Sequence, residues 1–267
     1  MNIMHRISYN DKKSKKIFQQ MNIKSKGEIV CYFDIGENDE NWKQVQEVVR
    51  HSKGEIIDNQ FKTLFSKKEL SASQYFVMVP TWHFLYPEPK DDFEYENITY
   101  DSSKKCSFCN QGLVQKDLFS IREAPKWGNK DIGQLNWIFD EFFVTERLKN
   151  LLCEKFNLTF SQVRIHQTNI FCKNVFKLEI ESSVEIEDKQ ILDFETCPVC
   201  GRIKYHMCHN NFFPKISMMN NHIARTKEFF GSGKSAYNQI IIDRYLFDFF
   251  IQNKIKGCDF IPIANKN

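Results

Sequence analysis

The chain of 267 residues is 42% hydrophobic and 27% charged, as in a globular protein with one large domain or two modest ones. Its 25 Phe against only 10 Gly and 7 Pro predict thick aromatic cores and few long loops. The formal net charge is +3, and no apolar stretch approaches the roughly 18 residues of a membrane-spanning helix, so a membrane-embedded protein is not expected.

Basic residues are concentrated near the start of the chain. Residues 1–27 carry one arginine and six lysines against Asp11 alone, which leaves the remainder slightly acidic. Such a segment could contact nucleic acid, yet it lacks both dense arginines and the interleaved aromatic residues of base stacking. We therefore expect a solvated face or a frayed terminus, with no membrane partner, and nucleic acid is not the expected partner. Because no apolar run of signal-peptide length follows these lysines, we expect a cytoplasmic protein.

The first hundred residues predict a small α+β module, residues 1–100, built from β-α-β pieces. Residues 28–35 alternate as a strand and residues 75–80 form another. Between them lies a helix whose apolar positions recur at helical spacing: Trp42, Val45, Val48 and Val49. The polar, proline-containing residues 85–103 are predicted to form a linker or an excursion from the module.

A short helix in this module is marked by its first residues. Ser66 and Glu69 have the spacing of a capping box, in which each side chain accepts a hydrogen bond from the other residue's backbone N–H. Phe65 and Leu70 stand at the positions of a hydrophobic staple. We therefore expect a helix to begin after Ser66.

Residues 101–267 predict a larger α+β domain in which two segments share one pattern. Residues 142–160 and 240–263 each contain a strand, a capping residue, an amphipathic helix and a short strand, and the capping residues are Thr145 and Asp243. The apolar helix faces consist of Val144, Leu148, Leu151, Leu152 and Phe156 in the first segment and Leu246, Phe249, Phe250 and Ile255 in the second. We expect both units beside a common sheet, with residues 174–187 as an extended strand between them.

Two Cys-x-x-Cys pairs lie far apart in this larger domain: Cys106 with Cys109, and Cys197 with Cys200. A turn between paired cysteines directs two sulfurs to one point, and four thiolates complete the tetrahedral site that zinc prefers. In a reducing compartment the nine cysteines of the chain are free thiols or metal ligands. We therefore predict that these four cysteines share one zinc ion, and that the closed site is structural because it has no open position for catalysis.

The residue after each pair fits a tight turn. Gly201 follows the second pair and permits the close backbone approach in which amide N–H groups face a sulfur. Asn110 stands in its place after the first pair, where Asn is tolerated because it also adopts positive φ. The predicted fold class is α+β, a small N-terminal α/β module followed by a larger α+β domain with two strand-helix-strand units stapled by the four-cysteine site.

The long separation between the pairs leaves alternatives open. Two of the residues His206, Cys208 and His209 could join Cys197 and Cys200 in a local site. The four cysteines could also be unrelated buried thiols, or a redox pair, although neither pair begins an evident helix after a strand. Four other cysteines lie in apolar runs and are expected to be core thiols, and two histidines are expected to be ordinary polar residues: Cys31, Cys153, Cys172 and Cys258, and His166 and His222.

The sequence contains parts of three catalytic patterns. Gly233, Lys234 and Ser235 match the end of a P-loop, but Glu228 occupies the position of the required earlier glycine. A zinc deaminase needs a His-x-Glu or Cys-x-Glu upstream of its cysteine pair, and the chain has no such motif. A zinc-stapled nuclease of the HNH kind stays an alternative, because histidines follow the second pair and could bind a second, catalytic metal.

The order of these segments resembles a family, the bacterial double-CxxCG motif proteins of polymorphic-toxin loci. The resemblance rests on CSFC, FFVTERLKNLL, CPVCG and the closing IIIDRYLFDFFIQNKIKGCDFIPI, and it covers about residues 105–263. The first pair departs from the pattern because Asn110 replaces the glycine. The resemblance implies an immunity protein that binds and neutralises a protein toxin without being an enzyme. A zinc-dependent nucleic-acid adaptor is a further alternative, and neither the toxin nor the oligomeric state can be predicted.

Overall fold

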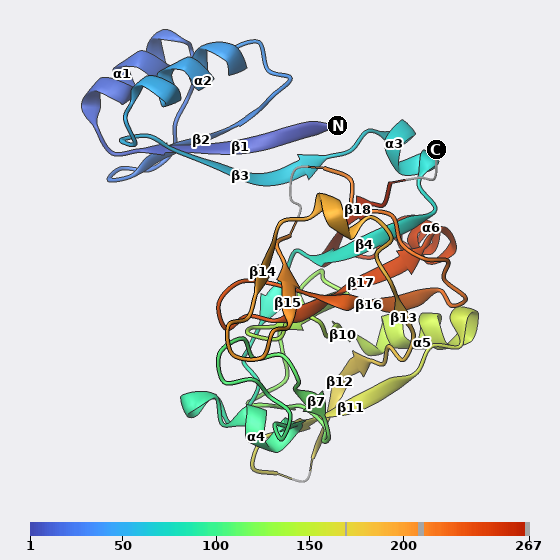
Figure 1. Cartoon of the computed structure of the whole chain (residues 1–267). Coiled ribbons are helices and arrows are strands. Elements are labelled where there is room, and N and C mark those ends of the chain that lie inside the picture. Colours follow the sequence, from blue (N-terminus) through green and yellow to red (C-terminus); the bar gives the residue numbers. More distant parts are fainter. Residues whose placement is uncertain (169, 208–210, 265–267) are drawn as a thin grey trace. The chain divides into compact units, whose positions relative to one another are not determined.

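The computed structural model describes residues 1–168, 170–207 and 211–264, and the chain divides into two compact units (Figure 1). The smaller unit consists mainly of Met1–Ala72, and the larger contains Ser73–Met207 and the segment from Phe213 onward. The division therefore falls near residue 72 rather than near residue 100. The reason is strand β4, Tyr75–Pro80, whose hydrogen-bonded neighbours β17 and β18 belong to the larger unit.

The smaller unit is a three-stranded antiparallel sheet covered on one face by two helices (Figure 1). Its strand order is β2-β1-β3. Its elements are β1 Asn2–Tyr9, α1 Lys12–Gln20, β2 Cys31–Gly36, α2 Trp42–His51, β3 Ile57–Leu64 and α3 Lys67–Ala72. The core between sheet and helices includes Ile7, Phe18, Phe33, Trp42 and Val45. The mixed helix and strand content of the predicted module is therefore confirmed.

Several predictions in the smaller unit are confirmed residue by residue. The backbone N–H of Ser66 donates to Glu69 (2.7 Å), and that of Glu69 donates to the Ser66 hydroxyl (3.2 Å), so the capping box starts α3. The lysines of α1 form a solvated helix face, whereas Ser14 and Phe18 of the same helix are buried. The predicted strand at 28–35 begins later, at Cys31, because the preceding residues form a bend with Ile29 exposed.

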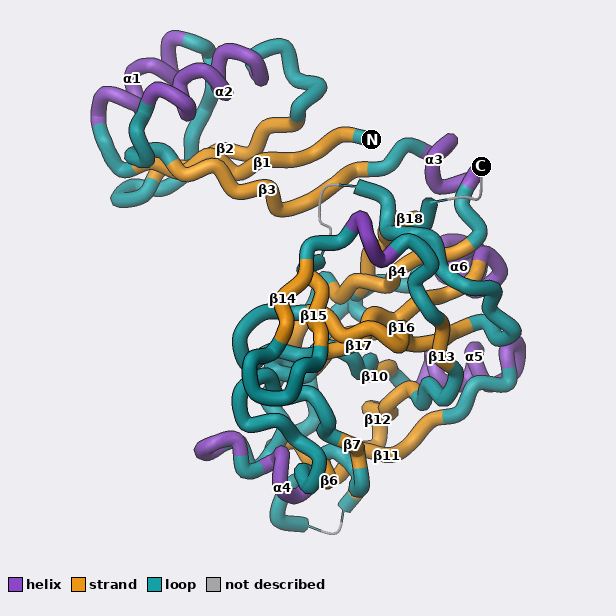
Figure 2. Tube along the Cα trace, viewed as in Figure 1, coloured by secondary structure: helices purple, strands orange, loops and turns teal. Residues whose placement is uncertain are grey.

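Strands and loops make up most of the larger unit, with α5 and α6 as its longest helices (Figure 2). Its elements up to α5 are β4, β5 His83–Phe84, η1 Asp91–Phe93, α4 Tyr95–Thr99, β6 Tyr100–Asp101, β7 Val114–Gln115, β8 Ser120–Ile121, β9 Ile132–Leu135, β10 Phe143–Val144 and α5 Glu146–Phe156. The remaining elements are β11 Phe160–Ile165, β12 Phe171–Leu178, β13 Ser183–Val184, η2 Lys189–Ile191, β14 Phe194–Thr196, β15 Ile203–Tyr205, β16 Ile223–Phe230, β17 Tyr237–Asp243, α6 Arg244–Gln252 and β18 Cys258–Pro262. Among the described residues, no helix is long and apolar enough to cross a membrane.

Two main sheets organise this unit. One has the strand order β5-β9-β10-β12-β11-β8, and the other has the order β14-β15-β16-β17-β4-β18 with β13 beside β16. The two strand-helix-strand segments lie in different sheets, so the prediction of a common sheet is wrong. Nevertheless β10 and β11 flank β12 in one sheet as β17 and β18 flank β4 in the other, and every one of these pairings is antiparallel. The two strand-helix-strand segments therefore share a local connectivity without sharing a sheet.

The caps of the two long helices are those predicted. The Thr145 hydroxyl accepts a hydrogen bond from the Leu148 N–H (3.3 Å), and the Asp243 carboxylate accepts one from the Leu246 N–H (2.8 Å). Each cap satisfies one of the backbone donors that a helix N-terminus leaves unpaired. The predicted faces are buried at Leu148, Leu152 and Phe156 in α5 and at Leu246, Phe249 and Phe250 in α6.

Two expectations about longer segments are corrected. Residues 85–103 are no linker, because they contain α4 and bury Tyr95 and Thr99 in the larger unit. The extended strand expected at 174–187 is interrupted after Leu178, and its continuation β13 pairs with β16 of the other sheet. The alternating sequence therefore carries the chain from one sheet to the other instead of forming one strand.

Candidate metal centre

The two Cys-x-x-Cys turns have the same backbone hydrogen bonds. In the first turn the Asn110 N–H donates to the Cys106 carbonyl, and the Cys106 N–H donates to the Gln111 carbonyl, both at 2.9 Å. In the second turn the Gly201 N–H donates to the Cys197 carbonyl, and the Cys197 N–H donates to the Arg202 carbonyl, again at 2.9 Å. The two turns are therefore equivalent knuckles contributed by distant parts of the chain.

The residue after the second cysteine of each knuckle is left-handed. Its φ is 59° at Asn110 and 70° at Gly201. This conformation is required because the amide of that residue must turn back to the first cysteine's carbonyl. Asn adopts it more readily than other non-glycine residues do. The prediction that Asn110 can replace glycine by adopting positive φ is thus confirmed.

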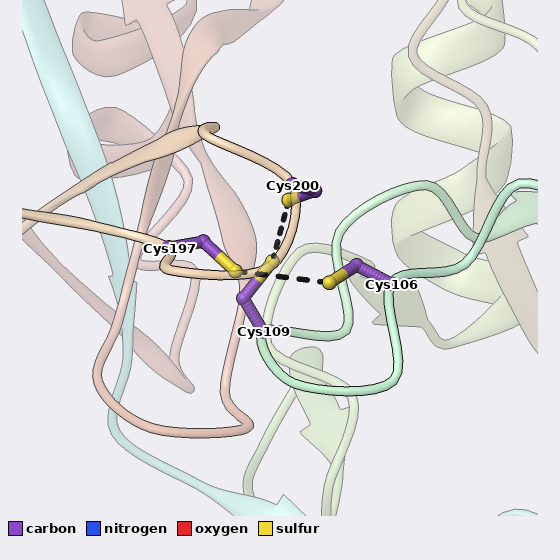
Figure 3. Close-up of side chains that lie close together, drawn as sticks. All are labelled: Cys106, Cys109, Cys197 and Cys200. Carbon is purple, nitrogen blue, oxygen red and sulfur yellow. Dashed lines mark hydrogen bonds between the residues drawn. The ribbon is translucent and has the colours of Figure 1, made fainter.

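The four predicted sulfurs lie together and point toward one another (Figure 3). The Sγ atoms of Cys106 and Cys197 are 3.7 Å apart, as are those of Cys109 and Cys200, and all four lie within 4.8 Å of one another. Metal–sulfur bonds of about 2.3 Å in a tetrahedron place the sulfurs about 3.8 Å apart. None of the four forms a disulfide. The arrangement therefore fits one metal ion at the centre of four thiolates.

Burial and backbone amides act on these thiols in different directions. The N–H groups of Cys109 and Phe108 face the Cys106 sulfur and lower its pKa to about 6. Burial opposes ionisation of Cys197, but the amides of Cys200 and Val199 outweigh it and lower the pKa of that thiol too. Burial raises the pKa of Cys109 to about 12. A bound cation would supply the positive charge that keeps all four sulfurs ionised.

Two side chains link the knuckles to each other. The guanidinium of Arg202 donates to the Gln111 carbonyl (2.7 Å), and the side-chain amide of Gln111 donates to the Ile203 carbonyl (3.2 Å). Gln111 and Arg202 both stand five residues after the first cysteine of their knuckle, so the two contacts cross between the turns. Neither side chain was predicted from the sequence to belong to the site. Their identical offset from the two cysteine pairs was the available signal.

The alternative ligands are not part of this group. Cys208 and His209 lie outside the described residues, and among the described residues only the four cysteines form a cluster that could hold a metal ion. His206 is exposed, whereas His222 Nδ1 lies 2.7 Å from the Asp243 carboxylate that also caps α6. The histidines of the nuclease alternative are thus not gathered into a second metal site in the part of the chain that is described.

The remaining cysteines follow the prediction with one exception. Cys31, Cys172 and Cys258 are buried, as expected for core thiols. Cys153 is exposed, and its thiol donates to the Leu158 carbonyl (3.4 Å). The prediction for Cys153 is wrong because the buried face of α5 follows Leu152 and Phe156, and a residue one position further along the helix points about 100° away from Leu152.

The Gly-Lys-Ser segment also has a clear place in the fold. Gly233, Lys234 and Ser235 lie in the loop between the antiparallel strands β16 and β17, with no helix after them. Lys204 Nζ holds this loop through the carbonyls of Gly233 and Ser235. A phosphate-binding P-loop needs a strand, the loop and then a helix. The segment is therefore a hairpin loop of the second sheet.

Comparison of the chain with models of known protein families and with curated proteins finds no match. The four-cysteine geometry therefore carries the functional interpretation.

Substitutions at Gly201 should separate backbone strain from steric clash. A Cβ added there meets no atom within 4 Å, so only the positive φ matters. We expect Gly201→Asn to be nearly neutral, because Asn110 has the same role, and Gly201→Val to cost about 1–2 kcal/mol. Thermal unfolding of the metal-loaded variants measures this difference. Equal stability of the Asn and Val variants would show that the left-handed turn is not required.

Proposed function

We propose that the chain is a zinc-stabilised protein-binding protein, and that it neutralises a protein toxin as an immunity protein rather than acting as an enzyme. The observation that carries the zinc proposal is the convergence of four cysteine sulfurs from two equivalent knuckles. Soft thiolates favour zinc over the hard cations, which prefer oxygen ligands.

A four-thiolate site assigns the metal a structural role. Catalytic zinc needs a position for water or substrate, whereas four protein ligands fill the tetrahedron. The site also joins two segments that are far apart in sequence, since Cys106 pairs with Cys197 and Cys109 with Cys200. The metal then supports the shape of the larger unit, and function resides in the surfaces that this shape presents.

The immunity role is supported by the resemblance of the segment order to the double-CxxCG proteins. The segments that carry the resemblance all belong to the larger unit: the two knuckles, β10 with α5, and β17 with α6 and β18. We propose that the chain belongs to this family and that it lies in the cytoplasm, where the toxin would act. The protein partner is the product of a neighbouring toxin gene.

Coexpression tests this function directly. We expect the chain to restore growth of cells that express a toxic product of a neighbouring reading frame, and to purify with that product as a stable complex. Joint replacement of His206, His209 and His222 by Gln should preserve protection, because binding rather than catalysis is responsible. Failure to protect against any neighbouring product would refute the immunity role. Loss of protection in a triple variant that still folds and binds zinc would favour the HNH-like nuclease.

A further inference from the structure

A cavity of about 740 Å³ lies beside the first knuckle and is lined from several segments of the larger unit. Its volume is in the range of sites that bind a small molecule or a side chain with its neighbours. The wall near the knuckle includes Ser107, Asn110 and Gly112. Zinc binding and the shape of this cavity are therefore connected through the same loop.

Aromatic rings form much of the cavity wall. They include Phe93, Tyr95, Trp137, Phe139 and Tyr237. Trp137 contacts Phe93 at 4.6 Å between ring centroids, and Phe139 contacts Tyr237 at 5.5 Å. Phe93, Trp137 and Phe139 are 50%, 36% and 43% exposed, so these rings keep surface available for a ligand. Aromatic faces attract organic cations through the negative charge of the ring face.

The backbone at this rim is held in unusual conformations. Asp92, Phe93 and Trp137 all have positive φ, at 48°, 60° and 70°. Large residues rarely adopt this region, which costs of order 1–3 kcal/mol for each residue. Strain of this kind persists where the surrounding structure fixes it, and it gathers at ligand sites. Three residues of the cavity wall therefore hold conformations that the surrounding structure has to stabilise.

Asp140 lies on the same wall, and its carboxylate has no ionic partner among the described residues. Asp140 is half-buried. Burial raises the pKa of its carboxyl, while the Arg225 charge and the backbone N–H groups of Asp140 and Asn238 oppose the shift. Arg225 does not pair with it, because its nitrogens donate to the Glu141 carboxylate and to the carbonyls of Asp140 and Ile180. Among the described residues, no basic side chain forms a salt bridge with the Asp140 carboxylate.

The other charges that line the cavity leave it acidic. Lys105 forms an ion pair with Glu96, so these two charges cancel. The other charged lining residues are Asp92 and Asp140, which are acidic, and Lys234 of the hairpin loop, which is basic. A cation with an apolar stem would meet the carboxylate of Asp140 and the aromatic faces at once.

We propose that this cavity binds a basic side chain, an arginine or lysine, of the protein partner. Asp140 accepts hydrogen bonds from the charged group, and the rings of Trp137 and Phe139 cover its aliphatic stem. This inference rests on the proposed protein-binding function and identifies where that function recognises its partner.

The test uses the full zinc-loaded chain and acetylated, amidated Gly-Arg-Gly as the probe. The matched control peptide carries citrulline, which has the shape of arginine without its charge. Binding is followed through the indole N–H signal of Trp137, assigned by a Trp137→Phe variant. We expect a saturable shift with the arginine peptide only. Asp140→Asn should weaken it about tenfold or more, as expected for loss of a charge-assisted hydrogen bond, and Lys234→Gln should leave it unchanged or tighter.

Several results would overturn the proposal. These are the absence of a saturable shift, equal binding of the citrulline peptide, equal binding by Asp140→Asn, or loss of binding in Lys234→Gln, which would indicate an anion site. Tighter binding of free agmatine than of the peptide would assign the cavity to a small amine instead of a protein side chain. Zinc content and unfolding temperature verify each fold. If Asp140→Asn does not fold, Phe139→Leu at the exposed rim serves instead and should weaken the peptide several-fold.

The two proposals can fail separately. If Asp140→Asn loses peptide binding yet still protects cells as well as the unmodified chain, the cavity does not recognise the toxin and the immunity role stands. If the unmodified chain protects against no neighbouring product but binds the arginine peptide, the immunity role fails while the cation site stands.

Discussion

Replacing Cys109 with serine should release the metal and lower the unfolding temperature of the larger unit by about 10–20 °C. The hydroxyl of serine is a poor zinc ligand, and Cys109 is only 1% exposed, so its replacement leaves the buried side of the site without a thiolate. Structural zinc contributes about 10–16 kcal/mol of apparent binding free energy in zinc-finger peptides. If about 5 kcal/mol of this binding free energy is lost from the stability of the larger unit, its unfolding temperature falls by about 10–20 °C. Metal analysis and calorimetry measure both effects.

Cys153→Ser is the matched control, because Cys153 is a free thiol on the exposed side of α5. It should bind one zinc and unfold as the unmodified chain does. Hydrogen exchange resolves the two units: amides of β16 and β17 should lose protection in Cys109→Ser, whereas those of β1 and β2 should keep it, since that sheet has its own core. One bound zinc in the Cys109→Ser protein, with unchanged stability, would contradict the shared four-thiolate site.

Local signals explain why some features were predicted correctly. The caps at Thr145 and Asp243 and the box at Ser66 and Glu69 depend on residues three positions apart. The knuckle turns are likewise local, and their positive φ could be predicted from Gly201 and Asn110. In each case the physical cause and the sequence pattern lie within one turn of the chain.

Sheet membership could not be predicted in this way. β4 precedes the first knuckle in sequence, yet it lies between β17 and β18 from the end of the chain. β12 has the equivalent place between β10 and β11. β4 is apolar, whereas β12 also carries Lys173, Asn174 and Lys177. Neither strand carries a mark of which neighbours it will pair with, because pairing is decided by the burial of both sheet faces together.

Part of the site also depended on distant contacts. The crossed hydrogen bonds of Gln111 and Arg202 exist only once the knuckles meet. Asp140 could not be recognised as a cavity residue, because the cavity is lined by segments that lie far apart in the chain: residues 92–113, 137–140 and 229–238. The four-cysteine cluster could nevertheless be predicted, because two Cys-x-x-Cys pairs indicate a tetrahedral thiolate site wherever the pairs stand in the sequence.

Arg225 connects the two sheets through buried charge, and its removal should be the second large effect. Its guanidinium in β16 lies 2.8 Å from the carboxylate of Glu141, which precedes β10 of the other sheet and is 8% exposed. Lys177 of β12 lies 3.6 Å from the same carboxylate. Arg225→Met leaves Glu141 buried with only this longer contact, and removal of one partner of a buried pair costs about 3–5 kcal/mol. Chemical denaturation at neutral pH measures the loss.

The pH dependence and a double variant identify the cause. Burial raises the pKa of Glu141, and Arg225 opposes that shift, so Arg225→Met should raise the pKa further. Above pH 4.5, the ordinary pKa of a glutamate, the folded variant keeps a proton on Glu141 that the unfolded chain releases. The free energy of unfolding of the variant therefore falls as the pH rises above 4.5. Arg225→Met should therefore recover stability on acidification toward that value. Arg225→Met with Glu141→Gln should regain most of the loss at neutral pH and lack the part of this slope that comes from Glu141. The Asp140 carboxyl, whose pKa is also raised, contributes to the slope in both proteins. Arg164→Met, at a half-exposed pair with Asp117, should cost less than about 1 kcal/mol. An equal loss at both arginines would show that burial of Glu141 is not the cause.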